Sequence, residues 1–336
     1  MTDIARRPTI RDVATVAGVS SGTVSRVLNG KNWVSPESKA RVDAAIKKTG
    51  YRVNAHARGL AMNRSNTIAF LLTETQSVLF EDPNFGALVR GTSAELAKRD
   101  ISFVLIMAGD EAERTRAMNY ITAGHVDGVL LAFTSASGNP LVKSLVDARV
   151  PMVSAGQPLG FEGRLGCVAA DDLHGAITMT TYLLDRGRVR VATIAGPRDT
   201  PGGIARLEGY RRVLGDRFDQ GLVRHGDYTR ESGVVAMREL LQEHPDIDAV
   251  FAANDAMAAG AIEVLQAAGR RVPDDVAVAG FDDSVFAATT TPSITTMRQP
   301  FGRISAEMVR VLVDIIDGAG PSTLMLPTEL VQRESA

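Results

Sequence analysis

The 336-residue sequence contains a single cysteine, Cys167, so it can form no intramolecular disulfide and cannot assemble a zinc site from several thiolates. Five histidines are present, without HExxH or any other close ligand spacing: His56, His125, His174, His225 and His244. No apolar run reaches the ~18 residues of a membrane span, and the opening MTDIARRPTIRDVATV lacks the apolar stretch of a signal peptide. We therefore expect a soluble cytoplasmic protein that holds no metal.

Glycine-rich phosphate-binding motifs are also missing. Neither GxGxxG nor GxxxxGK[ST] occurs, which argues against dinucleotide and P-loop chemistry. Residues 18–22 match the GxSxG nucleophile elbow, but that elbow follows a buried strand and this segment follows a predicted helix. No paired acid and base accompanies a nucleophile, so the sequence predicts no enzyme, no catalytic residue and no cofactor.

The charge is distributed unevenly along a chain of otherwise ordinary globular composition, with 45% apolar and 23% charged residues. Residues 1–64 carry 12 Lys+Arg against 4 Asp+Glu, a net of +8. The other 272 residues carry 25 against 35, a net of −10, and the two sum to −2. A basic head on an acidic body indicates that one end meets a polyanion, with a solvated charged surface as the alternative.

The first 50 residues read as three short helices, over Ile10–Ala17, Ser21–Leu28 and residues 36–49. Thr9, Ser20 and Ser35 are suitable N-caps, while glycines at positions 18 and 50 are suitable helix terminators. The few apolar side chains available suffice for a helix-turn-helix module and little else. Residues 54–62 are short and contain a glycine, so we interpret them as a linker that orders against a partner; a plain flexible connector is the alternative.

From Thr67 onward the pattern alternates between strands and helices. Apolar runs occupy residues 68–72, 103–108, 126–133, 150–154, 189–195, 249–253 and 276–279. Helical stretches between them cover residues 85–99, 111–123, 173–186, 204–214, 232–242 and 256–268. This spacing predicts parallel sheets covered on both faces, in two lobes with a cleft at the carboxyl ends of the strands. Polar clusters follow these strands, at residues 73–75, 254–255 and 282–284.

The head segment TIRDVATVAGVSSGTVSRVLNG is followed by YRVNAHARGL, and the body contains FAANDAMAAGAIEVL, VAVAGFDDS and ITTMRQPF. These segments resemble the lactose/galactose/purine repressor family (LacI/GalR). Its head pattern, T-I-x-D-V-A-x-x-A-G-V-S-x-x-T-V-S-R-V-L-N, is met at nearly every fixed position from Thr9 to Asn29. The resemblance runs from about Thr9 to Arg333. It implies an all-α helix-turn-helix head and an α/β two-lobe core with parallel sheets, similar to periplasmic binding proteins.

The resemblance also implies domain limits. We expect a DNA-binding head over residues 1–53, a hinge over 54–65 and an effector-binding and dimerisation core over 66–336. Lobe 1 is expected at about 66–165 and 300–326, and lobe 2 at about 166–299 and 327–336.

In the head, the resemblance places the second helix in the major groove. Arg26 can reach guanine O6 and N7 or a phosphate, whereas Ser21 offers one short hydroxyl and Gly22 has no side chain, which leaves the operator sequence open. Contacts to phosphates are expected from Thr9, Ser20, Thr23, Ser25 and Asn29. For Thr9, Ser20 and Ser25 the alternative is capping or packing, and Ser20 is expected to do both.

In the hinge, Leu60 stands where the family inserts a leucine between base pairs of the minor groove. Packing of Leu60 on the core is the alternative. Asn54 is expected to cap the hinge helix, and Ala57 and Arg58 to face the minor groove and its phosphates. The family's usual Pro-Asn is replaced here by Val53 and Asn54.

In the core, the resemblance assigns effector binding to residues that follow strands. Arg206, Asn254 and Asp282 match most firmly, with helix capping as the alternative for the last two. Gln299 and Phe301 are expected at the lobe crossover, and Tyr228 against one face of a sugar ring or, alternatively, in ordinary surface packing. Ala155 and Gly156 replace a frequent aspartate. Glu74 and the loop 78–84 are expected to fill that gap.

We therefore expect a cytoplasmic, nucleoid-associated repressor of sugar-utilisation genes. It would bind near-palindromic double-stranded operator DNA as a homodimer and leave it on binding a mono- to oligosaccharide. A purine- or nucleoside-responsive repressor is one alternative. A solute-binding receptor of similar core fold is another, which the basic head and the missing signal peptide argue against.

Overall fold

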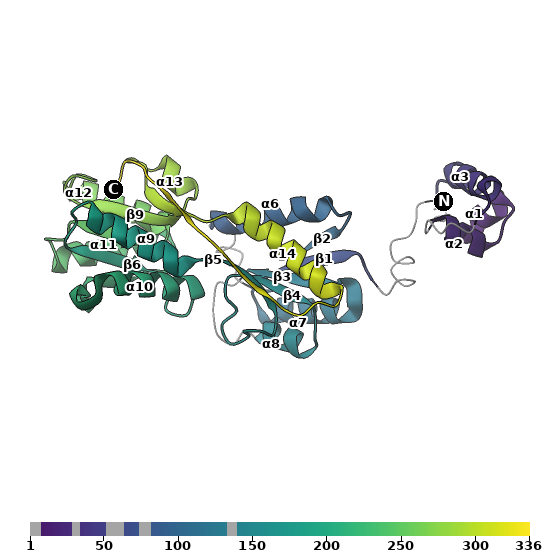
Figure 1. The fold of residues 1–336 in the computed structure, drawn as a ribbon, viewed down its shortest axis with the longest axis horizontal. Coiled ribbons are helices and arrows are strands. Elements are labelled where there is room, and N and C mark those ends of the chain that lie inside the picture. Colours follow the sequence, from purple (N-terminus) through teal and green to yellow (C-terminus); the bar gives the residue numbers. More distant parts are fainter. Residues whose placement is uncertain (1–7, 29–33, 52–63, 74–81, 133–139) are drawn as a thin grey trace, which may run out of the picture. The chain divides into compact units, whose positions relative to one another are not determined.

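The computed structural model describes residues 8–28, 34–51, 64–73, 82–132 and 140–336 (Figure 1). The chain divides into two compact units, Met1–Ser65 and Asn66–Ala336. Within the predicted hinge, residues 54–63 lie outside the described residues.

The first unit is a three-helix module of α1 (Ile10–Ala17), α2 (Ser21–Leu28) and α3 (Pro36–Thr49). Local signals explain the ends of these helices. Asp12 Oδ2 accepts hydrogen bonds from both the backbone N–H and the hydroxyl of Thr9, each at 2.7 Å, and Gly18 ends α1 at φ 64°. Val13, Val24 and Val42, one from each helix, are fully buried and form the centre of a small core. The predicted helix-turn-helix module is confirmed.

The second unit contains two six-stranded sheets, each with helices on both faces. In the first sheet the strand order is β11-β5-β4-β3-β1-β2, and neighbouring strands of the described residues all run parallel. Its strands are β1 (Thr67–Leu72), β2 (Ser102–Met107), β3 (Gly128–Ala132), β4 (Met152–Ala155), β5 (Gly166–Ala170) and β11 (Thr323–Leu326).

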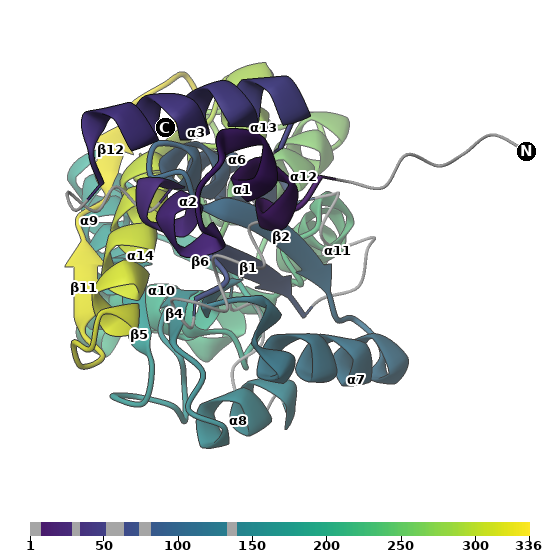
Figure 2. The same ribbon diagram turned by 90° about the vertical axis from the view of Figure 1, so that its right-hand side faces the viewer.

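Apolar side chains of β1 alternate between the two faces of the sheet, which explains why helices cover both faces. Ile68 and Phe70 pack with α6 (Pro83–Ala97) and α14 (Phe301–Ile316). Ala69 and Leu71 point the other way, toward α7 (Glu111–Tyr120) and α8 (Pro140–Asp147). Figure 2 shows α7 and α8 on the side of the sheet opposite α14. A π-helical turn, Ile121–His125, follows α7.

The second sheet has the order β12-β10-β9-β8-β6-β7, and its edge strand β12 runs antiparallel to β10. Its strands are β6 (Val191–Ala195), β7 (Val223–His225), β8 (Ala249–Ala252), β9 (Ala277–Asp282), β10 (Thr295–Arg298) and β12 (Glu329–Val331). One face packs on α9 (Asp172–Asp185) and α10 (Pro201–Leu214), the other on α11 (Arg230–Glu243), α12 (Asp255–Ala267) and α13 (Val285–Thr289). Short 3-10 turns occupy Gly215–Arg217 and Gln220–Leu222.

The chain passes between the lobes after β5, after β10 and after β11. We expected the second lobe to begin at about residue 166, but β5 (Gly166–Ala170) belongs to the first sheet. Its backbone pairs with β4 on one side and with β11 on the other. The second lobe therefore begins with α9, because residues 166–170 complete the hydrogen bonding of the first sheet.

Candidate functional site

A cleft lies at the carboxyl ends of the strands and is lined by both lobes. The empty space inside it, including the part open to solvent, is about 850 Å³. The second lobe contributes Asp172, Thr200, Pro201, Gly202, Arg206, Tyr228, Asn254 and Asp282. The first lobe and the crossover contribute Asp82, Asn84, Phe85, Leu88, Ala132, Ala155, Gly156, Ala169, Ala170, Gln299, Phe301 and Ile304.

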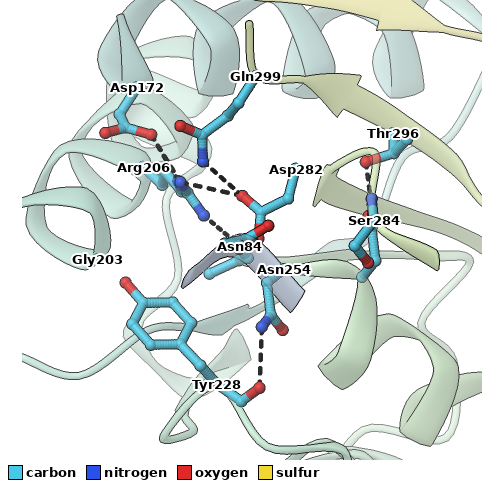
Figure 3. A network of polar contacts seen from close by, with 12 residues as sticks. Asn84, Asp172, Gly203, Arg206, Tyr228, Asn254, Asp282, Ser284, Thr296 and Gln299 are labelled. Carbon is cyan, nitrogen blue, oxygen red and sulfur yellow. Dashed lines mark hydrogen bonds and ion pairs between the residues drawn. The ribbon is translucent and has the colours of Figure 1, made fainter. Parts of the chain in front are cut away.

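Arg206, on α10, is the central cation of the cleft, and its side chain is only 7% exposed (Figure 3). Nε and Nη2 each lie 2.8 Å from Asp172 Oδ1, and Nη2 lies 3.3 Å from Asp282 Oδ1. The Phe281 ring covers one face of the guanidinium, with its centroid 3.8 Å from Cζ. Burial alone would lower the pKa of Arg206, but the two carboxylates outweigh it and raise the pKa. The guanidinium is therefore charged and held in one orientation.

Asp282 ends β9 in a left-handed conformation, with φ 105°, and is 5% exposed. Its Oδ1 accepts a hydrogen bond from Gln299 Nε2 at 2.6 Å, and its Oδ2 accepts one from Asn84 Nδ2 at 2.7 Å. Burial raises the pKa of Asp282, while the charge of Arg206 and these two amide donors stabilise its ionised form. The carboxylate consequently joins the second lobe, the crossover and the first lobe at one point.

Asn254 caps α12, because its Oδ1 accepts from the backbone N–H of Met257 at 2.9 Å. Its Nδ2 donates to the backbone oxygen of Tyr228 at 2.9 Å. The Tyr228 hydroxyl pairs with Thr200 Oγ1 at 2.9 Å, and its ring lies so close to Gly196 that a Cβ there would be 2.5 Å from the hydroxyl oxygen. The capping alternative for Asn254 is thus present in the structure, and one hydrogen and one lone pair of its amide remain for another partner.

The first lobe meets the cleft through the start of α6. Asp82 caps this helix by accepting from the backbone N–H of Asn84 at 2.9 Å. Burial, with a further contribution from the charge of Asp282, raises the pKa of Asp82 to about 6. This side of the cleft therefore combines an amide and a carboxyl group with the apolar surfaces of Phe85 and Phe301.

The structure brings together six of the residues predicted for the effector site. These are Arg206, Tyr228, Asn254, Asp282, Gln299 and Phe301. The seventh, Glu74, lies outside the described residues. The prediction missed Asp172, although this residue follows β5 as the other polar residues follow their strands. Asp82 lies within the loop 78–84 that was assigned to the site. Asn84 ends the loop that was predicted to fill the gap beside Ala155 and Gly156.

In the head, Thr9 and Ser20 serve as local caps; Ser20 Oγ accepts from the backbone N–H of Thr23 at 3.1 Å. Arg26 is exposed in the last turn of α2, and a Cβ on Gly22 would lie 3.9 Å from its Nη2. The face of α2 at Ser21 and Gly22 is therefore open, with one long cationic side chain beside it. Five residues with predicted DNA contacts lie outside the described residues: Asn29, Asn54, Ala57, Arg58 and Leu60.

Two features of the described residues bear on function. They contain no group of three or more His, Cys, Asp or Glu side chains that would hold a metal ion. No helix among them is both long and apolar enough to cross a membrane. The cleft residues are donors, acceptors and aromatic surfaces, which suit recognition of a polar small molecule.

A helix-turn-helix head and a two-lobed α/β core with a polar cleft define a DNA-binding regulator with a ligand-binding core. Residues 9–54 match the model of bacterial regulatory proteins of the lacI family, and residues 180–336 match the periplasmic binding protein-like domain. The HTH-type transcriptional regulator CelR of Thermobifida fusca is 45% identical over 336 residues, 98% of each chain. The ribose operon repressor of Escherichia coli K12 is 36% identical over 309 residues, 91% of this chain and 92% of that protein. The chain belongs to the lacI family of bacterial transcriptional regulators.

Solved structures agree with this assignment. A CelR–cellobiose complex is similar at 43% identity with a TM-score of 0.78, covering 98% of this chain and 100% of that chain. A lac repressor dimer bound to operator and the anti-inducer ONPF gives a TM-score of 0.84 at 26% identity, over 98% and 99% of the two chains. The predicted family, fold class and role as a DNA-binding transcriptional regulator are confirmed.

Proposed function

We propose that this protein is a repressor of sugar-utilisation genes and that a β-linked glucose disaccharide, cellobiose, releases it from its operator. The observation that carries the proposal is the ring of Asn84, Asp172, Arg206, Asp282 and Gln299 around one cleft. The relative at 43% identity whose structure is a cellobiose complex supports the choice of sugar.

The polar side chains around the cleft suit the vicinal hydroxyls of a sugar. A hydroxyl can donate to a carboxylate while it accepts from a guanidinium or an amide, and here both kinds of partner stand side by side. Phe301, Phe85 and Tyr228 supply aromatic surface for the C–H faces of the rings. Asn254 contributes the remaining positions of its amide to the same site.

We place DNA binding in the head and in the hinge. Arg26 reads a base or a phosphate in the major groove, and Ser21 presents one short hydroxyl to the same groove. Contacts to phosphates come from Thr9, Ser20, Thr23, Ser25 and Asn29. Asn54 caps the hinge helix, and Ala57, Arg58 and Leu60 act in the minor groove. The protein binds as a homodimer to a near-palindromic site, because one three-helix head buries too little surface for specific affinity. It acts in the bacterial cytoplasm, on nucleoid DNA.

The switch is a change in the closure of the two lobes. An effector shifts such an equilibrium only through its different affinity for the two states. A sugar bound in the cleft beside Asn84 of one lobe and Asp282 of the other contacts both lobes only when they are closed. Closure then moves the dimer contacts of the first lobe and separates the hinge segments, which releases the DNA.

A thermal-shift screen of the full chain tests the effector, because a ligand at 100 times its Kd stabilises the protein by ~2.7 kcal/mol. Cellobiose is expected to raise the Tm, whereas ribose, purines and nucleosides at the same concentration leave it unchanged. A larger shift with a nucleoside would overturn the choice of a sugar.

Reciprocal coupling tests the switch independently. If cellobiose lowers operator affinity by some factor, operator must lower cellobiose affinity by the same factor. Fluorescence anisotropy with labelled operator measures operator affinity with and without cellobiose. Calorimetry measures cellobiose affinity with and without operator. Binding of cellobiose without any change in operator affinity would contradict the proposed role as inducer.

A further inference from the structure

A carboxyl group lies buried just behind the cleft and takes no part in lining it. It belongs to Asp255, the first residue of α12, which has no exposed surface. Within the part of the chain that the structure describes, no Lys, Arg or His forms an ion pair with it. A buried carboxyl group without a cation is costly to keep, so its contacts indicate what it holds in place.

The two oxygens of Asp255 bind two different elements. Oδ1 accepts from the Thr296 hydroxyl of β10 at 2.6 Å, and Oδ2 accepts from the backbone N–H of Ser284 at 2.7 Å. Figure 3 shows Ser284 and Thr296 grouped at this point, beside the strand that ends in Asp282. Gly280 leaves room for the carboxyl group, since a Cβ there would lie 2.3 Å from Oδ1.

The segment that Asp255 holds is a strained turn. Asp282 and Asp283 are consecutive non-glycine residues with positive φ, 105° and 58°. Side chains avoid this region, so it persists only where neighbouring contacts determine it. The Asp283 carboxylate forms ion pairs with the guanidinium groups of Arg298 and Arg333, each at 2.6 Å. The first backbone N–H after the turn is that of Ser284, and it donates to the buried carboxyl group of Asp255.

We propose that Asp255 is the positioning residue of the effector site: by holding Ser284 it keeps the Asp282–Asp283 turn left-handed and directs the Asp282 carboxylate into the cleft. The proposal rests on the proposed function only in taking Asp282 as an effector contact. Asp255 and the neighbouring Asn254 then have parallel tasks at the start of α12. Asn254 holds the backbone of Tyr228, itself at φ 73°, and Asp255 holds the backbone beside Asp282.

The protonation of Asp255 fits this role. Burial, together with the charge of Asp282, raises the pKa of Asp255 to about 8. A neutral acid can donate to the Thr296 hydroxyl through one oxygen and still accept from the Ser284 amide through the other. Asparagine can make the same pair of bonds, so it is the conservative replacement here.

The first experiment measures hydrogen exchange of the full chain without any sugar. Asp255→Ala is expected to speed amide exchange of a peptide covering residues 279–286 by at least roughly tenfold, because the Ser284 amide loses its hydrogen bond to the buried carboxyl group. Asp255→Asn is expected to exchange as the unchanged protein does. Thr193→Val is the matched control, since it removes a buried threonine hydroxyl bond to the Phe251 backbone in the same sheet.

The second experiment measures cellobiose affinity by calorimetry. Asp255→Ala is expected to weaken it by roughly 10- to 100-fold and Asp255→Asn by less than about threefold. In an Asp282→Asn background the additional loss from Asp255→Ala should shrink to less than about threefold, because the position of the lost carboxylate no longer matters. Full additivity of the two substitutions would overturn the proposal.

The two experiments distinguish a failure of the effector assignment from a failure of the positioning role of Asp255. If the unchanged protein binds no cellobiose, the effector assignment fails, and hydrogen exchange still decides the role of Asp255. Unchanged exchange over residues 279–286 in Asp255→Ala, or an equal rise there in Thr193→Val, overturns the positioning role. Should Asp255→Ala not fold, Thr296→Val removes one bond to the same carboxyl group and is compared with Thr193→Val in its place.

Discussion

Asn84 Nδ2 donates a 2.7 Å hydrogen bond to Asp282 Oδ2 across the cleft, between residues 198 positions apart in the chain. Asn84 lies in the first turn of α6 in one lobe, and Asp282 ends β9 in the other. Because the acceptor is a carboxylate, this bond belongs to the stronger class of protein hydrogen bonds. It links the site where we place the sugar to the closure of the lobes.

Replacing Asn84 with alanine is expected to lower cellobiose affinity about tenfold, because a bond to a charged group in the closed state contributes ~1.5–3 kcal/mol. Before sugar is added, the radius of gyration of the variant should be larger than that of the unchanged protein, since the open lobes are favoured. Calorimetry and small-angle scattering measure the two effects. Asn119→Ala, at an exposed position of the same lobe, is the control and should change neither.

Arg206→Ala is expected to abolish cellobiose binding and to leave a repressor that stays on its operator when sugar is added. The change leaves Asp172 and Asp282 without their cation, which costs ~3–5 kcal/mol of stability for a buried pair. A gel shift with and without cellobiose is therefore run at a temperature where circular dichroism shows the variant folded. Release of DNA by sugar in this variant would exclude Arg206 from the site.

Asp82→Asn is expected to stabilise the protein in a pH-dependent way. The pKa of Asp82 in the folded chain is about 6, above the ordinary 3.8, so the folded state binds the proton more tightly than the unfolded state. Its ionisation therefore costs stability as the pH rises from about 4 to 6, by up to ~3 kcal/mol above that window.

Asparagine keeps the cap of α6 and removes that ionisation. The variant should exceed the unchanged protein in unfolding free energy by ~1–3 kcal/mol at about pH 7.5 and by nothing at about pH 4. Urea unfolding followed by fluorescence across this range measures the difference. A difference that is constant with pH would show that Asp82 titrates normally.

Arg26→Ala should weaken specific DNA binding by ~1–3 kcal/mol if the guanidinium reads a guanine. If it contacts only a phosphate, the loss should be the same on unrelated DNA. Anisotropy titrations of operator and scrambled duplexes at one salt concentration separate the two. Equal losses on both duplexes would remove Arg26 from the residues that read bases.

Leu60→Ala is expected to reduce operator affinity and DNA bending together, because a side chain that no longer separates two base pairs cannot kink the duplex. Cellobiose binding should stay unchanged. A circular-permutation gel assay measures the bend, and an unaltered bend angle would show that Leu60 is not inserted.

Local signals determined the helices of the head, and the family resemblance supplied most candidate site residues. The ends of α1 and α2 were predictable because caps and terminating glycines act within one helical turn, as with Thr9, Asp12 and Gly18. Arg206 and Asp282 were named through the family resemblance. The position of Asp282 immediately after a strand also indicated the cleft edge of a parallel sheet.

Pairings between distant segments decided the rest, and only the tertiary structure contains them. The short strands β7 and β10 carry too few residues for a periodic signal, and β5 joined the first sheet because β4 and β11 flank it. Two hydrogen bonds of the site join distant parts of the chain, those of Asn84 with Asp282 and of Arg206 with Asp172. They form only because helices from these parts pack beside one cleft. The left-handed turn at Asp282 was also invisible, because an aspartate adopts positive φ only where contacts such as that of Asp255 with Ser284 outweigh the local strain.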